Sequence, residues 1–392
     1  MLKRDPSLDK PSLDRLKSLD IFRGLIMVIM AVDHVSYFVA KNHYYECWGI
    51  APPHFPDMVS FLTRFITHIC APGFFFMMGA GMILFWNSRQ KQGWTESKIT
   101  RFFLIRGLIL ILIQFNLENP AWGMGMFSDK TQSLISMAIP GGGEKVFIHF
   151  GVLYALGMSM IIWAWLRRFK TSILLAVSIS SLLLTQILIP AAENAERLYS
   201  PILRMLLIPG RTGIMQVLYP IVPWLGFTGL GIVFAKKLAR DRKIIIRWSL
   251  WGGLTSLFLF GVVRVLGSFG NFHPPQDSSV ISFLNVTKYP PSLTFILLTL
   301  GMNGLLLFLS NKFERGLEKR AKPLLAFGQT ALFFYITHLY LFAVIGFAFP
   351  TGTGNGMLWI IWAGGVAALY PLCWWYRRFK GKKSSNSIWR FF

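Results

Sequence analysis

The sequence predicts an all-α integral membrane protein that crosses the bilayer about ten times and keeps both chain ends in the cytoplasm. Three observations support this prediction. Hydrophobic residues make up 54 % of the 392 positions and charged residues only 15 %, whereas about a quarter of a soluble domain is charged. The hydrophobic residues are gathered in long runs. Lysine and arginine are gathered in every second segment between these runs.

Ten runs are long and apolar enough to cross the hydrocarbon core, which takes about 20 helical residues. They lie at about 19–40, 59–86, 101–117, 146–166, 172–190, 212–235, 245–267, 291–310, 323–348 and 356–376. The third run is short, and the sixth contains Pro220 and Pro223, which predict a kink. The first run lacks a cleavage site, so we expect it to remain as both signal and anchor.

The positive charges predict the orientation. With a cytoplasmic amino terminus, 30 of the 40 lysine and arginine residues fall in cytoplasmic segments, seven in outer segments and three inside helices. A wrong helix count would disrupt this alternation. The net charge of +23 therefore reflects topology and attraction to anionic lipid, and we predict no nucleic-acid partner. We expect a cytoplasmic segment at 1–18, one transmembrane domain at 19–376 and a basic cytoplasmic tail at 377–392.

Three predicted outer loops are long, at about 118–145, 191–211 and 268–290. They contain glycine, proline and aromatic residues. Loops of this kind commonly carry binding residues. We therefore expect them to cover or line a cavity on the outer side.

The first run, RLKSLDIFRGLIMVIMAVDHV, carries Asp20, Arg23, Asp33 and His34. Arg23 and His34 are eleven residues apart, which places them on one helix face about 16 Å apart along the axis. Asp20 lies on the same face. We expect Arg23 near the cytoplasmic surface and His34 in the outer half of the membrane.

Other ionisable residues are predicted near the depth of His34. A charge in the hydrocarbon is costly, so each such residue is a functional candidate. Together with Asp33, the candidates for an outer polar pocket are Arg64, His68, His149, Arg264, Lys288 and His338. Such a pocket would permit acid–base chemistry.

Structural interpretations of several helix residues stay open. His68 and His149 can instead bond a neighbouring helix, and Arg64 and Arg264 can form structural ion pairs or extend to the interface. Arg106 lies one turn from a basic loop, and we expect it to be an interface residue.

The loop histidines and the cysteines carry less information. His43, His54 and His273 lie in outer loops, where we expect them to be solvated. No pair of histidines has the spacing of helical metal ligands, and the three cysteines are far apart, so no metal site is predicted.

The pattern of Leu19-Asp20, Arg23-Gly24 and His34 resembles the opening of multipass membrane acyltransferases, in which an arginine and a histidine on the first helix mark the active site. Five segments, in order, also resemble the bacterial membrane protein family related to the catalytic domain of heparan-α-glucosaminide N-acetyltransferase. These segments are RLKSLDIFRGLIMVIMAVDHV, FLTRFITHICAPGFFFMMGAG, VLYPIVPWLGFTGLGIVFAKK, SFLNVTKYPPSLTFILLTLG and FGQTALFFYITHLYLF.

The resemblance implies a membrane acyltransferase. Such an enzyme moves an acetyl or other short acyl group from cytosolic acyl-CoA, here acetyl-CoA, to a sugar or glycan acceptor on the far side of the membrane. It further implies a location in the bacterial cytoplasmic (inner) membrane, with membrane lipid as a partner and a homo-oligomer as an open possibility.

The resemblance also assigns roles to residues of the first helix. His34 and Asp33 become the catalytic candidates, and Arg23 and Asp20 the candidates for the acyl-CoA side. The animal enzyme has its reactive histidine further toward the lumen, in a region that corresponds here to the loop with His43 and His54. The identity of the catalytic histidine therefore stays open.

Two other functions fit the same polar residues. A transporter or flippase would use the pocket to bind an envelope metabolite, but would be expected to show an inverted repeat with matching broken helices, which the sequence lacks. An envelope scaffold would leave the buried ionisable residues unexplained.

Overall fold

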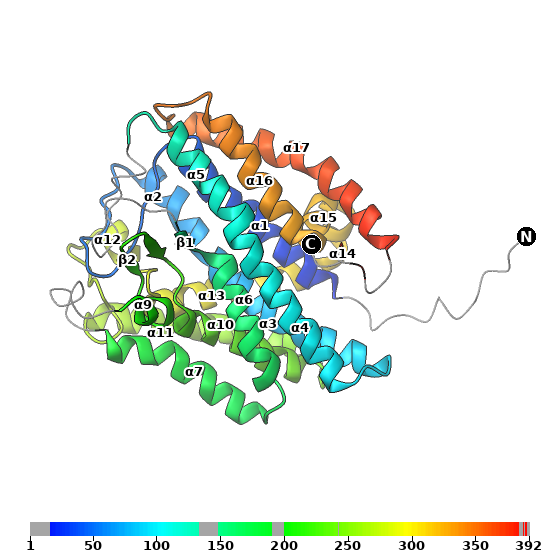
Figure 1. Ribbon diagram of the computed structural model, residues 1–392. Helices are drawn as coiled ribbons and strands as arrows, with labels where there is room; N and C mark the ends of the chain where they lie inside the picture. The colour runs from blue at the N-terminus through cyan, green and yellow to red at the C-terminus, as the bar shows by residue number, and fades with distance from the viewer. Residues whose placement is uncertain are drawn as a thin grey trace, which may run out of the picture.

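The computed structural model describes residues 16–132, 148–189, 200–241, 243–383, 387 and 389, which form a bundle of helices (Figure 1). Within these residues, eight helical segments are long and apolar enough to span a membrane. They are α1 (Lys17–Phe38), Met58–Lys91, Glu96–Ser128, α7 (Thr171–Leu188), α10 (Ile221–Leu238), α11 (Ile244–Leu266), α13 (Leu293–Lys312) and α17 (Asn355–Gly381). The prediction of an all-α, multi-pass membrane protein is confirmed.

Two further predicted runs form helices of a different kind. The run at 323–348 is a pair, α15 (Lys322–Gln329) and α16 (Ala331–Gly346), bent by 97°. The run at 146–166 yields α6 (Val152–Leu166), which is apolar but only 15 residues long. Each of the ten predicted runs therefore contains a helix.

The two ends of the bundle differ in character. The described connections at 92–95, 167–170 and 239–241 and the short helix α14 (Glu314–Arg320) lie at one end, which we call the basic end (Figure 1). Connections at 39–57, 208–220, 267–292 and 347–354 lie at the other, which we call the loop end. The beginning of α1 and the end of α17 both lie at the basic end (Figure 1).

The chain before α6 and α10 forms strands, so the predicted helix starts at 146 and 212 are wrong. Strands β1 (Ile148–Phe150), β2 (Gly210–Thr212) and β3 (Met215–Val217) form a small sheet in the order β1-β3-β2. Gly213, at φ 53°, makes the tight turn between β2 and β3. Residues 146–147 lie outside the described part of the chain.

The two prolines of the sixth run lie at the start of α10 and give no reason for a kink there. Pro220 is the residue before the first turn of α10, and Pro223 lies within that turn. A proline there removes no helical hydrogen bond, because the first amides of a helix have no partner inside it. α10 is accordingly one continuous span.

The second and third runs are longer than predicted, and each is interrupted. α2 (Met58–Phe65) leads through a short 3₁₀ turn at Ile66–Ile69 into α3 (Cys70–Lys91). α4 (Glu96–Ile113) leads through a π-helical turn, η3 (Gln114–Glu118), into α5 (Asn119–Ser128). A π-helical turn inside an α-helix is frequently found at a functional site.

α1 runs through the middle of the bundle and packs closely on α15. A Cβ atom on Gly24 would lie 1.9 Å from the carbonyl oxygen of Leu324, and a Cβ on Gly328 would lie 1.9 Å from that of Asp20. Glycine at these two positions lets the backbones touch, as in other membrane helix pairs. This contact holds the start of α1 against the bend between α15 and α16.

Candidate active site

The polar face of α1 meets α16 inside the bundle. The rings of His34 and His338 lie nearly coplanar and edge to edge, with their centroids 4.8 Å apart and 23° between the ring planes, and Nδ1 of His34 is within hydrogen-bond reach of Nε2 of His338. Nδ1 of His338 lies 2.9 Å from the carbonyl oxygen of Phe334, one turn earlier in α16. Both histidines are buried. His338 is thus the residue that holds the ring of His34.

This chain of contacts determines which nitrogen of His34 can take a proton. A carbonyl oxygen only accepts hydrogen bonds, so Nδ1 of His338 donates to Phe334 and its Nε2 carries a lone pair. Nδ1 of His34 donates to that lone pair, which leaves Nε2 of His34 with a lone pair of its own. His34 is therefore held as the tautomer that can accept a proton at Nε2.

Asp33 belongs to a buried group of charges. Nη1 of Arg64 donates to Oδ1 of Asp33 at 2.5 Å, and the same guanidinium donates to both carboxylate oxygens of Glu46 at 2.8 and 2.6 Å. Nε2 of His68 lies 3.4 Å from Glu46. Burial acts to raise the pKa of Glu46, but Arg64 and His68 outweigh it and hold the pKa below its usual range. Arg64 and His68 therefore keep Glu46 ionised, and Arg64 also holds Asp33 in place.

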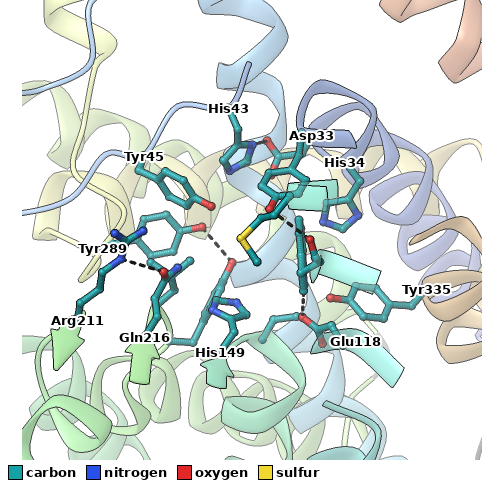
Figure 2. A pocket seen from close by; sticks show the side chains of 16 residues that line it. Asp33, His34, His43, Tyr45, Glu118, His149, Arg211, Gln216, Tyr289 and Tyr335 are labelled. Carbon is teal, nitrogen blue, oxygen red and sulfur yellow. Dashed lines mark hydrogen bonds and ion pairs between the residues drawn. The ribbon is translucent and has the colours of Figure 1, made fainter. Parts of the chain in front are cut away.

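A cavity of about 110 Å³, the loop-end cavity, lies in front of Asp33 and His34 (Figure 2). Its wall combines α1, the η3–α5 segment, the small sheet, one residue each of α6 and α16, and residues of three connecting segments. Six of its residues have aromatic rings: Tyr37, Tyr45, Trp122, Tyr219, Tyr289 and Tyr335. The cavity therefore presents flat apolar faces together with a small number of polar groups.

The small sheet supplies a row of polar side chains to this cavity. In the strand register, Gln216 of β3 is paired with His149 of β1 on one side and with Arg211 of β2 on the other. Directly paired residues point to the same face, and all three line the cavity. Nε of Arg211 donates to Oε1 of Gln216 at 3.2 Å. Burial lowers the pKa of His149 to about 4, so its ring is neutral near pH 7.

The π-helical turn aims Gln114 and Glu118 inward. Both are buried, and Glu118 lines the loop-end cavity. Oε1 of Glu118 accepts a hydrogen bond from Nε1 of Trp122 at 3.1 Å, whereas its Oε2 has no hydrogen-bond partner within the described part of the chain. Oε1 of Gln114 accepts from the amide of Tyr154 at 3.2 Å, which ties the turn to α6.

His43 enters the cavity from the loop after α1, so the prediction that it is solvated is wrong. It is 9 % exposed, lines the loop-end cavity, and its Nδ1 lies 3.6 Å from Oδ1 of Asp33. Burial lowers the pKa of His43 to about 4, so it is also neutral near pH 7. His54 is exposed, and His273 is partly buried with Nδ1 2.9 Å from the hydroxyl of Thr287.

Lys288 lies behind the loop-end cavity, in the loop before α13. It is 3 % exposed and lines a smaller cavity of about 40 Å³ that it shares with Asp33 and His34. Burial and the charge of Arg64 lower the pKa of Lys288 to about 8. The ammonium is therefore mostly protonated at neutral pH.

Arg264 does not line either of these cavities. Its guanidinium donates to a group of loop acceptors at 2.6 to 2.8 Å, which are the carbonyl oxygens of His273, Ser282, Phe283 and Asn285 and the side chain of Asn271. Arg264 therefore fixes the loop between α11 and α13, from which Lys288 extends.

A second, larger cavity of about 1360 Å³ opens at the basic end and contains the other polar residues of α1. Nη1 of Arg23 lies 3.0 Å from the carbonyl oxygen of Gly328 and 3.3 Å from Oδ1 of Asp20. Arg106 lines the cavity too. Its nine cationic residues are Arg23, Arg89, Lys91, Arg106, Arg168, Lys170, Lys236, Lys237 and Arg240, with Asp20 as its one carboxylate.

Sequence reasoning found part of the loop-end site. Asp33, His34 and His149 line it and His338 supports it, but His43, Glu118, Arg211 and Gln216 were missed. Glu118 ends an apolar run, and its charge there could have marked it. Within the described residues, no group of three His, Cys, Asp or Glu side chains could hold a metal ion.

A comparison with protein families matches residues 15–267 to the family described as heparan-alpha-glucosaminide N-acetyltransferase, catalytic. The matched residues include α1, the small sheet with His149, and the π-helical turn with Glu118. The chain belongs to this family. It is therefore a multi-pass membrane protein of the acetyltransferase type. Lys288 and His338 lie beyond the matched residues. No curated protein matches the chain.

Proposed function

We propose that this protein transfers an acetyl or other short acyl group from acyl-CoA at the basic end to a sugar or glycan acceptor at the loop end. One observation carries the proposal. A single helix, α1, places Asp20 and Arg23 in one large basic cavity and Asp33 and His34 in the polar cavity at the opposite end. The two sites are separated by a rise of about 16 Å along that helix.

The donor assignment rests on charge. CoA carries phosphate groups, and arginine and lysine are the side chains that bind phosphate best. The basic-end cavity has nine of them against one carboxylate. Arg23, on α1, is 26 % exposed and is proposed to contact the pantetheine part of acetyl-CoA, whose arm would extend along α1 and bring the thioester to His34.

The acceptor assignment rests on the mixture of side chains in the loop-end cavity. Aromatic rings can pack on the apolar faces of a sugar ring, and amide, guanidinium and carboxyl groups can bond its hydroxyl groups. Arg211, Gln216 and Glu118 supply such groups around the aromatic wall. An amino group or a hydroxyl group of the sugar would receive the acyl group.

In the proposed reaction, the acceptor nitrogen or oxygen attacks the carbonyl carbon of the thioester, and Nε2 of His34 takes its proton. The C–S bond then breaks, the acyl group stays on the acceptor, and CoA leaves as the thiol after His34 returns the proton. His34 is favoured as the base because His338 fixes its tautomer and because it lines both the loop-end cavity and the smaller cavity behind it. His43 lines only the former and is the competing candidate.

The proposal also sets the orientation and extent of the protein. The basic end would face the cytoplasm and the loop end the outside of a bacterial cytoplasmic membrane. Residues 19–376 would act as one domain between a cytoplasmic segment and a basic tail. Lipid would surround the exposed apolar side chains, for example Phe258 and Ile360, which are 70 % and 67 % exposed.

The test uses purified protein in liposomes, with labelled acetyl-CoA outside and an amino sugar trapped inside. We expect labelled sugar inside with the wild type, and little with His34→Gln, while both bind acetyl-CoA equally well. His54→Gln, which changes an exposed loop histidine, is the matched control and should behave as wild type.

Other outcomes assign the function differently. Full activity in His34→Gln and none in His43→Gln would make His43 the base. If the wild type binds no acetyl-CoA but lets the sugar cross the membrane, the protein is a transporter and the proposal is refuted.

A further inference from the structure

Lys288 is a buried cation whose ammonium has no hydrogen-bond acceptor within the part of the chain that the structure describes. Its side chain is 3 % exposed, and its amide, but not its ammonium, bonds the carbonyl oxygen of Glu46, at 2.9 Å. The ammonium lies over the ring face of Tyr289, 5.0 Å from the centroid. Burying an ammonium without acceptors is costly, so an unbonded one calls for an explanation.

Lys41 shows what a structural buried lysine looks like in this protein. It is 4 % exposed, close to the value for Lys288, but its ammonium donates to the carbonyl oxygens of Phe38 and Gly125 and to the hydroxyl of Ser128. Those bonds tie the end of α1 to α5. Lys288 makes no such ties.

The carboxylates near Lys288 already accept hydrogen bonds from Arg64. Asp33 and Glu46 are both bonded by Arg64, in part through two parallel bonds to Glu46. Lys288 contributes charge to this group, in which two cations face two carboxylates, with His43 and His68 at its edge. Its ammonium hydrogens remain available to another acceptor.

The side chain faces a space next to the base. Lys288, Asp33 and His34 line the same cavity of about 40 Å³. Met30 lines it too, so this cavity extends one helical turn further along α1, toward Arg23, than the loop-end cavity does. A thioester carried along α1 from the side of Arg23 by the pantetheine arm of CoA would reach this space before it reaches the loop-end cavity. The backbone bonds of Lys288 and Tyr289 to Glu46 hold the loop in place.

We propose that Lys288 is a catalytic residue whose ammonium binds the carbonyl oxygen of the acyl group and stabilises the negative charge that this oxygen gains. The inference rests on the proposed acyl transfer and adds a residue to it. When the acceptor attacks, the C=O pair of electrons moves to oxygen, and the ammonium of Lys288 faces that oxyanion without giving up its proton. When the C–S bond breaks, the pair returns and the oxygen becomes a carbonyl again.

A pre-positioned donor to an oxyanion usually contributes about 100- to 1,000-fold to kcat. We therefore expect Lys288→Met to lower kcat by about that factor, with unchanged binding of acetyl-CoA at the basic end and a melting temperature close to that of the wild type. Lys288→Arg keeps the charge and should recover part of the loss. Lys41→Met, the matched control, should lower the melting temperature instead.

The same measurements can overturn the proposal. It is wrong if Lys288→Met retains a kcat within threefold of the wild type, or if its loss of activity comes with the fall in melting temperature seen in Lys41→Met. It is also wrong if mass spectrometry finds the labelled acetyl group on Lys288 during turnover, because the lysine would then be a nucleophile. If Lys288→Met does not fold, Lys288→Arg and Lys288→Gln give the same comparison of charge. A wild type that transfers no acyl group refutes the proposed function itself.

Discussion

The contact between His34 and His338 makes a quantitative prediction. In His338→Phe the replacement ring can keep the contact with the ring of Phe334, which lies 5.2 Å away between centroids, but it turns a C–H edge toward Nδ1 of His34. What is lost is the acceptor at Nε2 for the proton on Nδ1 of His34. His34 must then either leave a buried donor unpaired or move that proton to Nε2.

Only the second outcome removes the reactive lone pair, because Nε2 then carries the proton, and the cost of the first outcome sets how often this happens. A buried donor left without a partner costs about 1–3 kcal/mol, which is about a 5- to 150-fold shift in the tautomer equilibrium. His34 is 7 % exposed and His338 is fully buried, so water cannot easily replace the lost acceptor. We therefore expect kcat to fall by about 5- to 150-fold, with the affinity for acetyl-CoA unchanged.

The assay is steady-state acyl transfer in detergent or liposomes, paired with equilibrium binding of acetyl-CoA. His338→Gln offers a side-chain oxygen as a replacement acceptor and should lose less activity than His338→Phe. Equal activity of the wild type and His338→Phe would refute the argument from tautomers. So would an equal loss in both variants.

Three more predictions follow from other contacts. Arg64→Met leaves Asp33 and Glu46 as buried carboxylates without their partner, and should lower the free energy of unfolding by about 3–5 kcal/mol in a reversible denaturation assay. Gly328→Ala places a Cβ against the backbone of Asp20 and should lower both the melting temperature and acetyl-CoA binding, whereas a Cβ on Gly316 meets nothing within 4 Å and Gly316→Ala should do neither. Because Lys288 has a pKa lowered to about 8 and acts while protonated, kcat should be retained below pH 8 and fall above it, and Lys288→Arg should lack this fall.

Helices were largely predictable because their signal is composition over a long run. A run of about 20 apolar residues can satisfy its backbone in a membrane mainly as a helix. The errors lie where that rule stops applying. Residues 212–217 are apolar enough to extend a run, but they lie at the loop end, where a strand can find a partner outside the bilayer. The turn at Gly213 was the local sign of this hairpin.

The candidate site was predictable along one helix but not between helices. Helical geometry alone placed Arg23 and His34 on one face of α1, and the structure puts them in two different cavities. Which other residues meet them depends on packing that no period in the sequence encodes. His338, which meets His34, lies 304 residues further along the chain. Arg264 was expected at the same depth, but its guanidinium donates instead to five acceptors of a loop.

The small sheet has a consequence for how such a protein changes its substrate over evolutionary time. Its strands are three residues long and come from segments that precede α6 and α10 without belonging to either helix. Exchanging Arg211, Gln216 or His149 alters one wall of the loop-end cavity and leaves the helices around His34 intact. A one-residue slip of β3 would turn Gln216 to the other face and bring its neighbours inward. If this cavity binds the acceptor as proposed, proteins with the same bundle can diverge in the acceptor they use while Arg23 and His34 on α1 stay the same.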